Sequence, residues 1–203
     1  VVKPKTVPIL VPADAEMVIE GKILPNVRRE EGPFGEFTGH AVSKDERQGK
    51  PIAPVEVSTA PMHDVVIAGD EVDLTKVPLL THYDVNAAPY ITAGIVVAAD
   101  PDSGVRNTSY NRLMMARKRE LRIFMAVGRH LWTLHNKLER RGEALPIAIV
   151  VGVHPLFSLG AQAFTPSTED EYAVIGGMMN EPLRVVKGKT VPILVPADAE
   201  MVI

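Results

Sequence analysis

Alternating and β-branched segments predict six strands in the first two thirds of the chain. Runs rich in Val, Ile, Thr and aromatic residues, separated by Gly, Pro or Asp, are typical of strands. They cover residues 6–11, 16–19, 64–68, 91–98, 107–115 and 121–127. A short charged turn at residues 117–120 joins the last two, which predicts an antiparallel hairpin.

The spacing of apolar positions becomes helical after residue 128. Residues 129–141 place Leu131, Leu134 and Leu138 on one face, and Gly142 follows as a stop signal. A buried strand is expected at residues 147–153, then short helices at residues 156–164 and 170–178, the second capped by Ser167 or Thr168. The pattern predicts an α+β fold in which helices cover sheets.

The end of the chain repeats its beginning. Residues 1–19 read VVKPKTVPILVPADAEMVI, and residues 185–203 read VVKGKTVPILVPADAEMVI, so only Pro4 and Gly188 differ. One repeat at this separation is not a solenoid. We interpret it as a rearranged chain order, in which the segment that follows Arg184 also stands at the front.

The two copies would compete for one strand position. One copy could fray while the other pairs, or the spare apolar strand could pair with a neighbouring chain. The second alternative predicts a homo-oligomer, such as a strand-swapped dimer. Residues 41–60 lack periodicity and are the linker candidate between residues 1–40 and a main body at residues 61–203.

Composition excludes several classes of partner. The 203 residues carry a formal charge of −3, and a basic group at residues 117–122 is typical of a solvated hairpin tip, so no nucleic acid is expected. The apolar runs at residues 93–99 and 145–153 are shorter than the roughly 18 residues that a membrane span needs. Cysteine is absent, which excludes disulfides and thiolate metal sites and favours a cytoplasmic location.

Residues 31–36, Glu-Gly-Pro-Phe-Gly-Glu, set two carboxylates on a stiffened turn. Like charges close together, or burial of one carboxylate beside Phe34, raise a carboxyl pKa and create a proton donor near neutral pH. Glu31 and Glu36 are therefore candidate acid/base residues. An acidic surface turn is the alternative.

A second set of candidate polar residues occurs in later segments of the chain. On a regular strand Asn107 and Arg112 point to opposite faces, so a bulge at Thr108 or Ser109 would be needed to place both on one site. Asn107, His130 and Glu171 together would suit Mg²⁺ or Mn²⁺, and the imidazole favours Mn²⁺. Individually, a turn asparagine, a structural histidine and a favourable charge at a helix start are the alternatives.

Five motifs lie along nearly the whole chain: VPADAEMVIEG (residues 11–21), EGPFGEFTG (31–39), DLTKVPLLTHYDVNAAPYITAG (73–94), RNTSYNR (106–112) and the stretch at residues 170–187. Together they resemble the UbiD family of prenylated-FMN-dependent decarboxylases. The resemblance implies a split β-barrel of the FMN-binding type with flanking helices. It also implies a lyase that decarboxylates aromatic or α,β-unsaturated acids reversibly, without oxidation.

The resemblance assigns roles by motif position. Arg112 would hold the substrate carboxylate beside Glu31, and Glu36 would donate the proton. Mn²⁺ would bind Asn107, His130 and Glu171, with K⁺ as a further candidate ion. The remaining contacts to prenylated FMN would come from Ser109, Tyr110, Asn111, Arg112, Arg129 and His130.

Two departures from the family pattern leave alternatives open. The turn at residues 31–36 precedes the Arg and metal residues instead of following them, and the large C-terminal domain expected after the turn is replaced by residues 41–60. A decarboxylase impaired by truncation is one reading. An inactive flavin-binding or structural module is a second, and a protein that binds unmodified FMN is a third.

Overall fold

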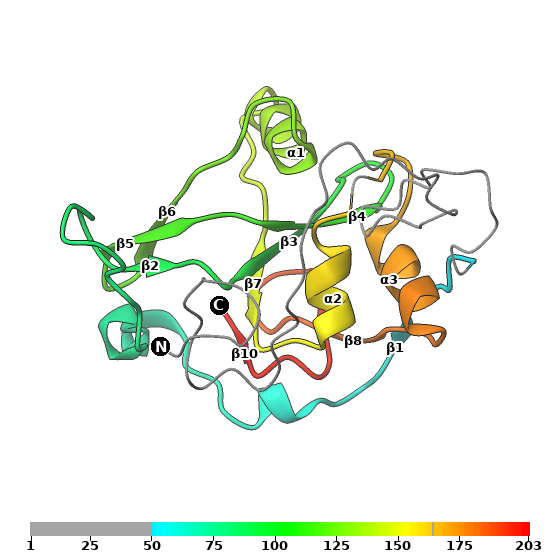
Figure 1. Cartoon of the computed structure of the whole chain (residues 1–203), viewed down its shortest axis with the longest axis horizontal. Helices are drawn as coiled ribbons and strands as arrows, with labels where there is room; N and C mark the ends of the chain where they lie inside the picture. Colours follow the sequence, from blue (N-terminus) through cyan, green and yellow to red (C-terminus); the bar gives the residue numbers. More distant parts are fainter. Residues whose placement is uncertain (1–49, 164) are drawn as a thin grey trace, which may run out of the picture. The chain divides into compact units, whose positions relative to one another are not determined.

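The computed structural model describes residues 50–163 and 165–203 (Figure 1). These residues form ten strands, three α-helices and three 3-10 helices in a mixed α+β arrangement. The strands fall into three sheets, with the orders β10-β7-β3-β4, β2-β5-β6 and β1-β8-β9. None of these three sheets closes on itself within the described part of the chain, so the split barrel stays a prediction.

The four-stranded sheet is the centre of the fold. It contains β3 (Ile95–Ala99), β4 (Arg106–Tyr110), β7 (Ala148–Val151) and β10 (Met201–Val202), all paired antiparallel. β3 is an apolar run that lies between two other strands, and residues 95–98 have no exposed surface. β4 is an edge strand, and it carries the polar RNTSY sequence.

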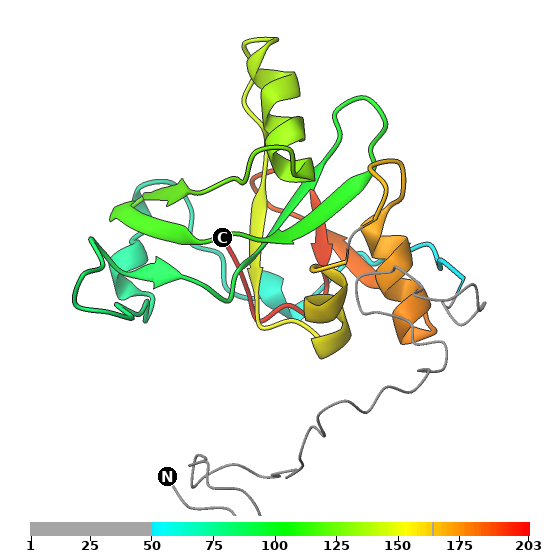
Figure 2. The same cartoon turned by 45° about the horizontal axis from the view of Figure 1, so that its top comes forward.

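Both faces of this sheet are covered, because side chains alternate along β3. Ile95 and Val97 pack into a cluster with α2 (Pro155–Gly160) and α3 (Glu171–Met179). Val96 and Ala98 pack into a second cluster with α1 (His130–Glu139). Figure 2 shows α2 and α3 next to each other and α1 apart from them. The continuous apolar run of β3 therefore reflects two buried faces.

The predicted helix at residues 129–141 is confirmed as α1, and Leu131, Leu134 and Leu138 are its buried residues. The predicted N-cap of α3 is wrong. Asp170 caps this helix, since its carboxylate accepts a hydrogen bond from the N–H of Tyr172, at 3.0 Å. No helix in the described residues is long and apolar enough to cross a membrane.

The hairpin predicted at residues 117–120 is confirmed. It joins β5 (Leu113–Arg117) to β6 (Glu120–Ile123), and β2 (Tyr90–Ile91) completes their sheet. The expected strand at residues 91–98 is two strands, since residues 92–94 leave one sheet and enter another. The expected strand at residues 107–115 is likewise broken at Asn111 and Arg112.

The strand predicted at residues 64–68 is wrong. This segment lies between the 3-10 helices η1 (Pro61–His63) and η2 (Gly69–Glu71), and Val65, Val66 and Ile67 are exposed. Its β-branched residues have the propensity for a strand but no neighbouring strand to pair with. A third 3-10 helix, η3 (Leu74–Lys76), follows before β2.

The third sheet contains two strands from the carboxy-terminal copy of the repeat. β8 (Arg184–Lys187) pairs antiparallel with β9 (Leu194–Pro196) and parallel with β1 (Val55–Glu56). β1 lies in the segment expected to be a linker, so two residues of that segment pair into a sheet. β10, also from this copy, completes the central sheet.

Gly188 closes the turn between β8 and β9. Its N–H donates a hydrogen bond to the carbonyl of Ile193, at 2.8 Å. A Cβ atom at this position would lie 2.9 Å from the carbonyl oxygen of Val191, a separation that side chains avoid. The turn therefore needs both the small residue and its backbone donor.

Candidate functional site

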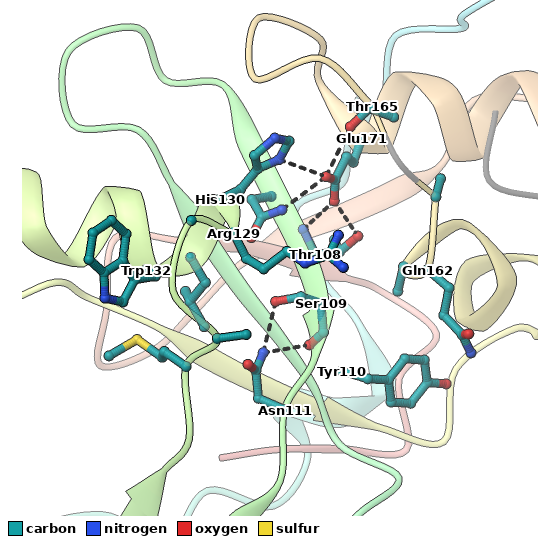
Figure 3. A pocket seen from close by; sticks show the side chains of 17 residues that line it. Thr108, Ser109, Tyr110, Asn111, Arg129, His130, Trp132, Gln162, Thr165 and Glu171 are labelled. Atoms are coloured by element: carbon teal, nitrogen blue, oxygen red, sulfur yellow. Dashed lines mark hydrogen bonds and ion pairs between the residues drawn. The ribbon is translucent and has the colours of Figure 1, made fainter. Parts of the chain in front are cut away.

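A cavity of about 570 Å³ lies beside β4 (Figure 3). Its walls come from β4 and the break that follows it, residues 125–132 at the start of α1, residues 161–163 and Thr165 after α2, and Glu171 at the start of α3. Segments far apart in sequence thus meet here, among them the RNTSYNR motif and the start of α3. Ten side chains around the cavity are labelled in Figure 3.

Glu171 is the central polar group at one side of this cavity. It is the first residue of α3 and is only 3% exposed. One carboxylate oxygen, Oε1, accepts hydrogen bonds from Asn107 Nδ2 at 2.9 Å and Thr165 Oγ1 at 3.1 Å. The other oxygen, Oε2, accepts from the backbone N–H of Thr108 and from Thr108 Oγ1 at 2.7 Å. Four donors therefore compensate the burial of this carboxylate.

His130 approaches the same carboxylate from α1. Its Nδ1 atom lies 3.6 Å from Glu171 Oε1, and its side chain is 34% exposed. Asn107, His130 and Glu171, which sequence reasoning proposed as a metal-binding set, are thus brought together by three different elements. Groups of three or more His, Cys, Asp or Glu suited to metal binding are absent from the described residues, and this set contains only two residues of those types.

The side-chain oxygen of Asn107 is buried beside the Glu171 carboxylate. Asn107 is 7% exposed, its Nδ2 donates to Glu171, and its Oδ1 has no hydrogen-bond partner among the residues that the structure describes. Buried polar atoms are nearly always paired, so an unpartnered carbonyl oxygen beside a carboxylate and an imidazole requires an explanation. An oxygen-binding divalent cation fits this set of donors.

The break after β4 is held by a local hydrogen-bond pair. Asn111 Nδ2 donates to the carbonyl and to the hydroxyl oxygen of Ser109, at 3.2 and 2.8 Å (Figure 3). Since Asn111 occupies an acceptor position of this hydroxyl, the Ser109 O–H is left to act as a donor. Ser109, Tyr110 and Asn111 all line the cavity, as do Arg129 and His130.

Arg112 lies outside the set of residues that line the cavity. It is exposed, and its guanidinium carbon lies 4.4 Å from the centre of the Phe124 ring in a cation–π arrangement. The expected bulge at Thr108 or Ser109 is a break at residues 111–112 instead. Glu31 and Glu36 lie outside the described residues, so their relation to Arg112 remains a prediction.

An ion-pair network anchors the far end of α1. Lys137 binds Asp100 and Asp102, at 2.7 Å each, and Arg141 binds Asp102. Burial opposes ionisation of Asp100, but hydrogen bonds from Lys137 and from two backbone N–H groups outweigh it and lower its pKa to about 2. The network ties α1 to the turn between β3 and β4, and so fixes the helix that begins with His130.

Sequence reasoning missed the two threonines that bind Glu171. Thr108 and Thr165 are buried, but a threonine in a strand or loop carries no signal for such a contact. It also missed Gln162, Met125 and Trp132 on the cavity wall. The RNTSYNR motif already contained Thr108, and its polar run in a buried strand was the available clue.

The fold of the chain is similar to that of solved UbiD-class enzymes. The fold is similar to HmfF, a UbiD-class enzyme from Pelotomaculum thermopropionicum solved in complex with FMN. The TM-score is 0.72 and the identity 42%, over 75% of this chain and 34% of that chain. It is also similar to the 3,4-dihydroxybenzoic acid decarboxylase AroY from Klebsiella pneumoniae, with a TM-score of 0.66 and 32% identity, over 76% of this chain and 34% of that chain. The fold is thus that of UbiD-class decarboxylases.

Sequence comparisons give the same result. The model of the UbiD family, described as the 3-octaprenyl-4-hydroxybenzoate carboxy-lyase Rift-related domain, matches residues 1–57 and 53–203. The anhydromevalonate phosphate decarboxylase of Methanothermobacter thermautotrophicus is 40% identical over 131 residues, 64% of this chain and 30% of the relative. The gallate decarboxylase of Lactiplantibacillus plantarum is 33% identical over 167 residues, 78% of this chain and 33% of the relative.

The chain belongs to the UbiD family. It spans about a third of the length of the relatives named above. The resemblance found in its motifs is therefore confirmed at the level of the family.

Proposed function

We propose that this chain forms the flavin- and metal-binding part of a non-oxidative decarboxylase that acts on an aromatic or α,β-unsaturated carboxylic acid. The observation that carries the proposal is the Oδ1 atom of Asn107, which has no hydrogen-bond partner within the described part of the chain and is buried beside Glu171 and His130 on the wall of the cavity. Membership of the UbiD family supports the reaction class.

A divalent cation, most suitably Mn²⁺, would be held by Asn107, His130 and Glu171. Two oxygen ligands and one imidazole satisfy the preferences of this ion. Thr108 and Thr165 donate hydrogen bonds to the Glu171 carboxylate, as the hydrogen-bond partners of metal ligands commonly do. A bound cation would offset the negative charge of a phosphate group in the cavity.

Prenylated FMN would supply an electron sink for decarboxylation when bound in the cavity. The chain's own residues would orient it and exclude water. Ser109 would donate a hydrogen bond, because Asn111 already occupies its acceptor position. Tyr110 and Arg129 line the same cavity. HmfF has been solved with FMN and, in an evolved dimeric form, with prenylated FMN, which supports this choice.

Proton transfer would fall to the residues proposed from the motifs. Arg112 would bind the substrate carboxylate and keep Glu31 ionised, and Glu36 would protonate the carbon that loses carbon dioxide. For Arg112 this requires the guanidinium to leave Phe124, an exposed contact worth about 0.5–1 kcal/mol.

The test uses the full chain produced together with a prenyl-flavin synthase. Bound flavin is identified by absorbance and mass spectrometry, bound manganese by elemental analysis, and carbon dioxide release is measured on a panel of aromatic and unsaturated acids. Glu36→Gln should keep the flavin and lose carbon dioxide release by at least about a hundredfold, as expected for loss of a general acid. Glu139→Gln, an exposed change at the end of α1, is the matched control.

The results separate the alternatives. Retained prenylated flavin without turnover by the unmodified chain would support an inactive flavin-binding module. Retention of unmodified FMN alone would support the third alternative, a protein that binds unmodified FMN. No retained flavin or manganese would contradict the proposal altogether.

A further inference from the structure

Two partly buried charges connect the start of β4 to the start of α3. Arg106 precedes Asn107 on β4, and Asp170 precedes Glu171 at the cap of α3. Arg106 Nε donates to Asp170 Oδ2 at 2.8 Å, and its Nη2 donates to the same oxygen. Their side chains are 18% and 23% exposed, so solvent screens this pair less than a surface ion pair.

Asp170 uses its two carboxylate oxygens for different tasks. Oδ1 accepts from the N–H of Tyr172 and caps α3, while Oδ2 accepts from Arg106. The guanidinium of Arg106 also lies 5.0 Å from the centre of the Tyr172 ring. The Asp170 side chain therefore caps α3 and also binds the start of this helix to β4.

The next residue on each element belongs to the proposed metal site. The sequence Arg106-Asn107 on β4 faces Asp170-Glu171 on α3, so an ion pair and a ligand pair lie next to each other. β4 is the edge strand of its sheet, and no further strand fixes its outer side among the described residues. The position of α3 along this edge determines the separation of Asn107 and Glu171.

We propose that Arg106 and Asp170 are positioning residues that hold Asn107 and Glu171 at the separation a divalent cation requires. The inference rests on the proposed function of the cavity. Neither residue contacts the ion. Their contribution matters because a cation would share the lone pairs of Glu171 and so weaken the hydrogen bonds that this carboxylate accepts from Asn107, Thr108 and Thr165.

Asp170→Asn separates the two tasks of this side chain. Asparagine is as good an N-cap as aspartate, so the cap of α3 is kept. The amide group would meet the Arg106 guanidinium with neutral oxygen or with N–H donors, so the charged pair is lost. Arg106→Met is the second variant. It removes the guanidinium, while the apolar methionine side chain can still cover the Tyr172 ring.

The experiment measures Mn²⁺ affinity of the flavin-free full chain by electron paramagnetic resonance, beside FMN affinity by fluorescence and thermal unfolding. Both variants should bind Mn²⁺ more weakly than the unmodified chain by about 10-fold, the lower end of the effect of losing a direct hydrogen-bond partner of a metal ligand, because Arg106 and Asp170 act on Asn107 and Glu171 only through the backbone. Arg184→Met removes an exposed pair with Asp198, at 3.5 Å, and should leave Mn²⁺ affinity unchanged. Asp170→Glu keeps the negative charge, so it should retain part of the Mn²⁺ affinity that Asp170→Asn loses.

The outcomes distinguish this inference from the proposed function. If the unmodified chain binds Mn²⁺ and both folded variants bind it within twofold as well, the positioning role is wrong and the proposed function stands. If the unmodified chain binds no Mn²⁺, the proposed function fails and the positioning role fails with it. Equal weakening by Arg184→Met would also overturn the inference, since the effect would then be general.

Discussion

The hydroxyl of Tyr172 offers a sharp test of how the fold supports the site. This side chain is fully buried in α3, one residue after Glu171, and its hydroxyl donates a hydrogen bond to the carbonyl of Leu194 at 2.8 Å. Burial raises the pKa of Tyr172 far above its ordinary value, so the hydroxyl remains a donor throughout the working pH range. The bond joins α3 to β9, in the carboxy-terminal copy of the repeat.

Tyr172→Phe removes only this donor. The ring keeps its edge contact with Phe157, at 5.7 Å between centroids, and its contact with Arg106. A neutral hydrogen bond contributes about 0.5–1.5 kcal/mol, and a buried acceptor left without its donor costs about 1–3 kcal/mol. We therefore expect the free energy of unfolding to fall by about 1–2 kcal/mol. For a chain of this size that corresponds to a loss of about 2–8 °C in melting temperature.

Urea unfolding followed by circular dichroism measures this change. The midpoint should fall while the slope with denaturant stays the same, because the surface exposed on unfolding is unchanged. Tyr83→Phe is the control, since Tyr83 is 72% exposed and should change stability by less than about 0.5 kcal/mol. A Tyr172→Phe protein as stable as the unmodified chain would refute the contribution assigned to this bond.

Two further changes test packing and electrostatics. Gly160→Ala would place a Cβ atom against Ile175 Cγ1, so the Ile175 side chain or the two helices α2 and α3 must shift. We expect the free energy of unfolding in urea to fall by about 1–3 kcal/mol, and unchanged stability would contradict the close packing. The pKa of Asp100 is lowered from 3.8 to about 2, so its ionised form stabilises the fold fully above pH 4, and this contribution is lost as pH falls towards 2. Asp100→Asn should flatten the melting temperature over that pH range, and an unaltered acid profile would show that Lys137 does not stabilise the fold through this residue.

Local signals predicted the parts of the fold that depend on short-range order. The leucine spacing of α1 and the charged turn between β5 and β6 each lie within one segment, so their pattern was sufficient. The breaks at residues 92–94 and 111–112 were missed, because an apolar or alternating run continues through both. Residues 64–68 were misassigned since a strand also requires a partner, which no local pattern supplies.

The candidate site was predictable only in its ligand types. Asn107, His130 and Glu171 were chosen for their donor atoms and by their motif positions in the family, and the structure brings them together. The support of Glu171 by Thr108 and Thr165 was not predictable, because it depends on how α3 meets the edge of β4. For the same reason the N-cap of α3 was predicted wrongly as Ser167 or Thr168. The N-cap is Asp170, whose second carboxylate oxygen binds Arg106 on β4, a strand distant in sequence.

The turn at Gly188 makes the two copies of the repeat unequal. The front copy has Pro4 at the matching position, and proline has no N–H to donate to the carbonyl that Gly188 binds. Leaving this buried acceptor without its donor would cost about 1–3 kcal/mol, and each 1.4 kcal/mol is a factor of ten in occupancy. Residues 185–203 should therefore outcompete residues 1–19 for the β8–β9 position, and exchanging the copies between chains would lose this hydrogen bond at every exchanged turn.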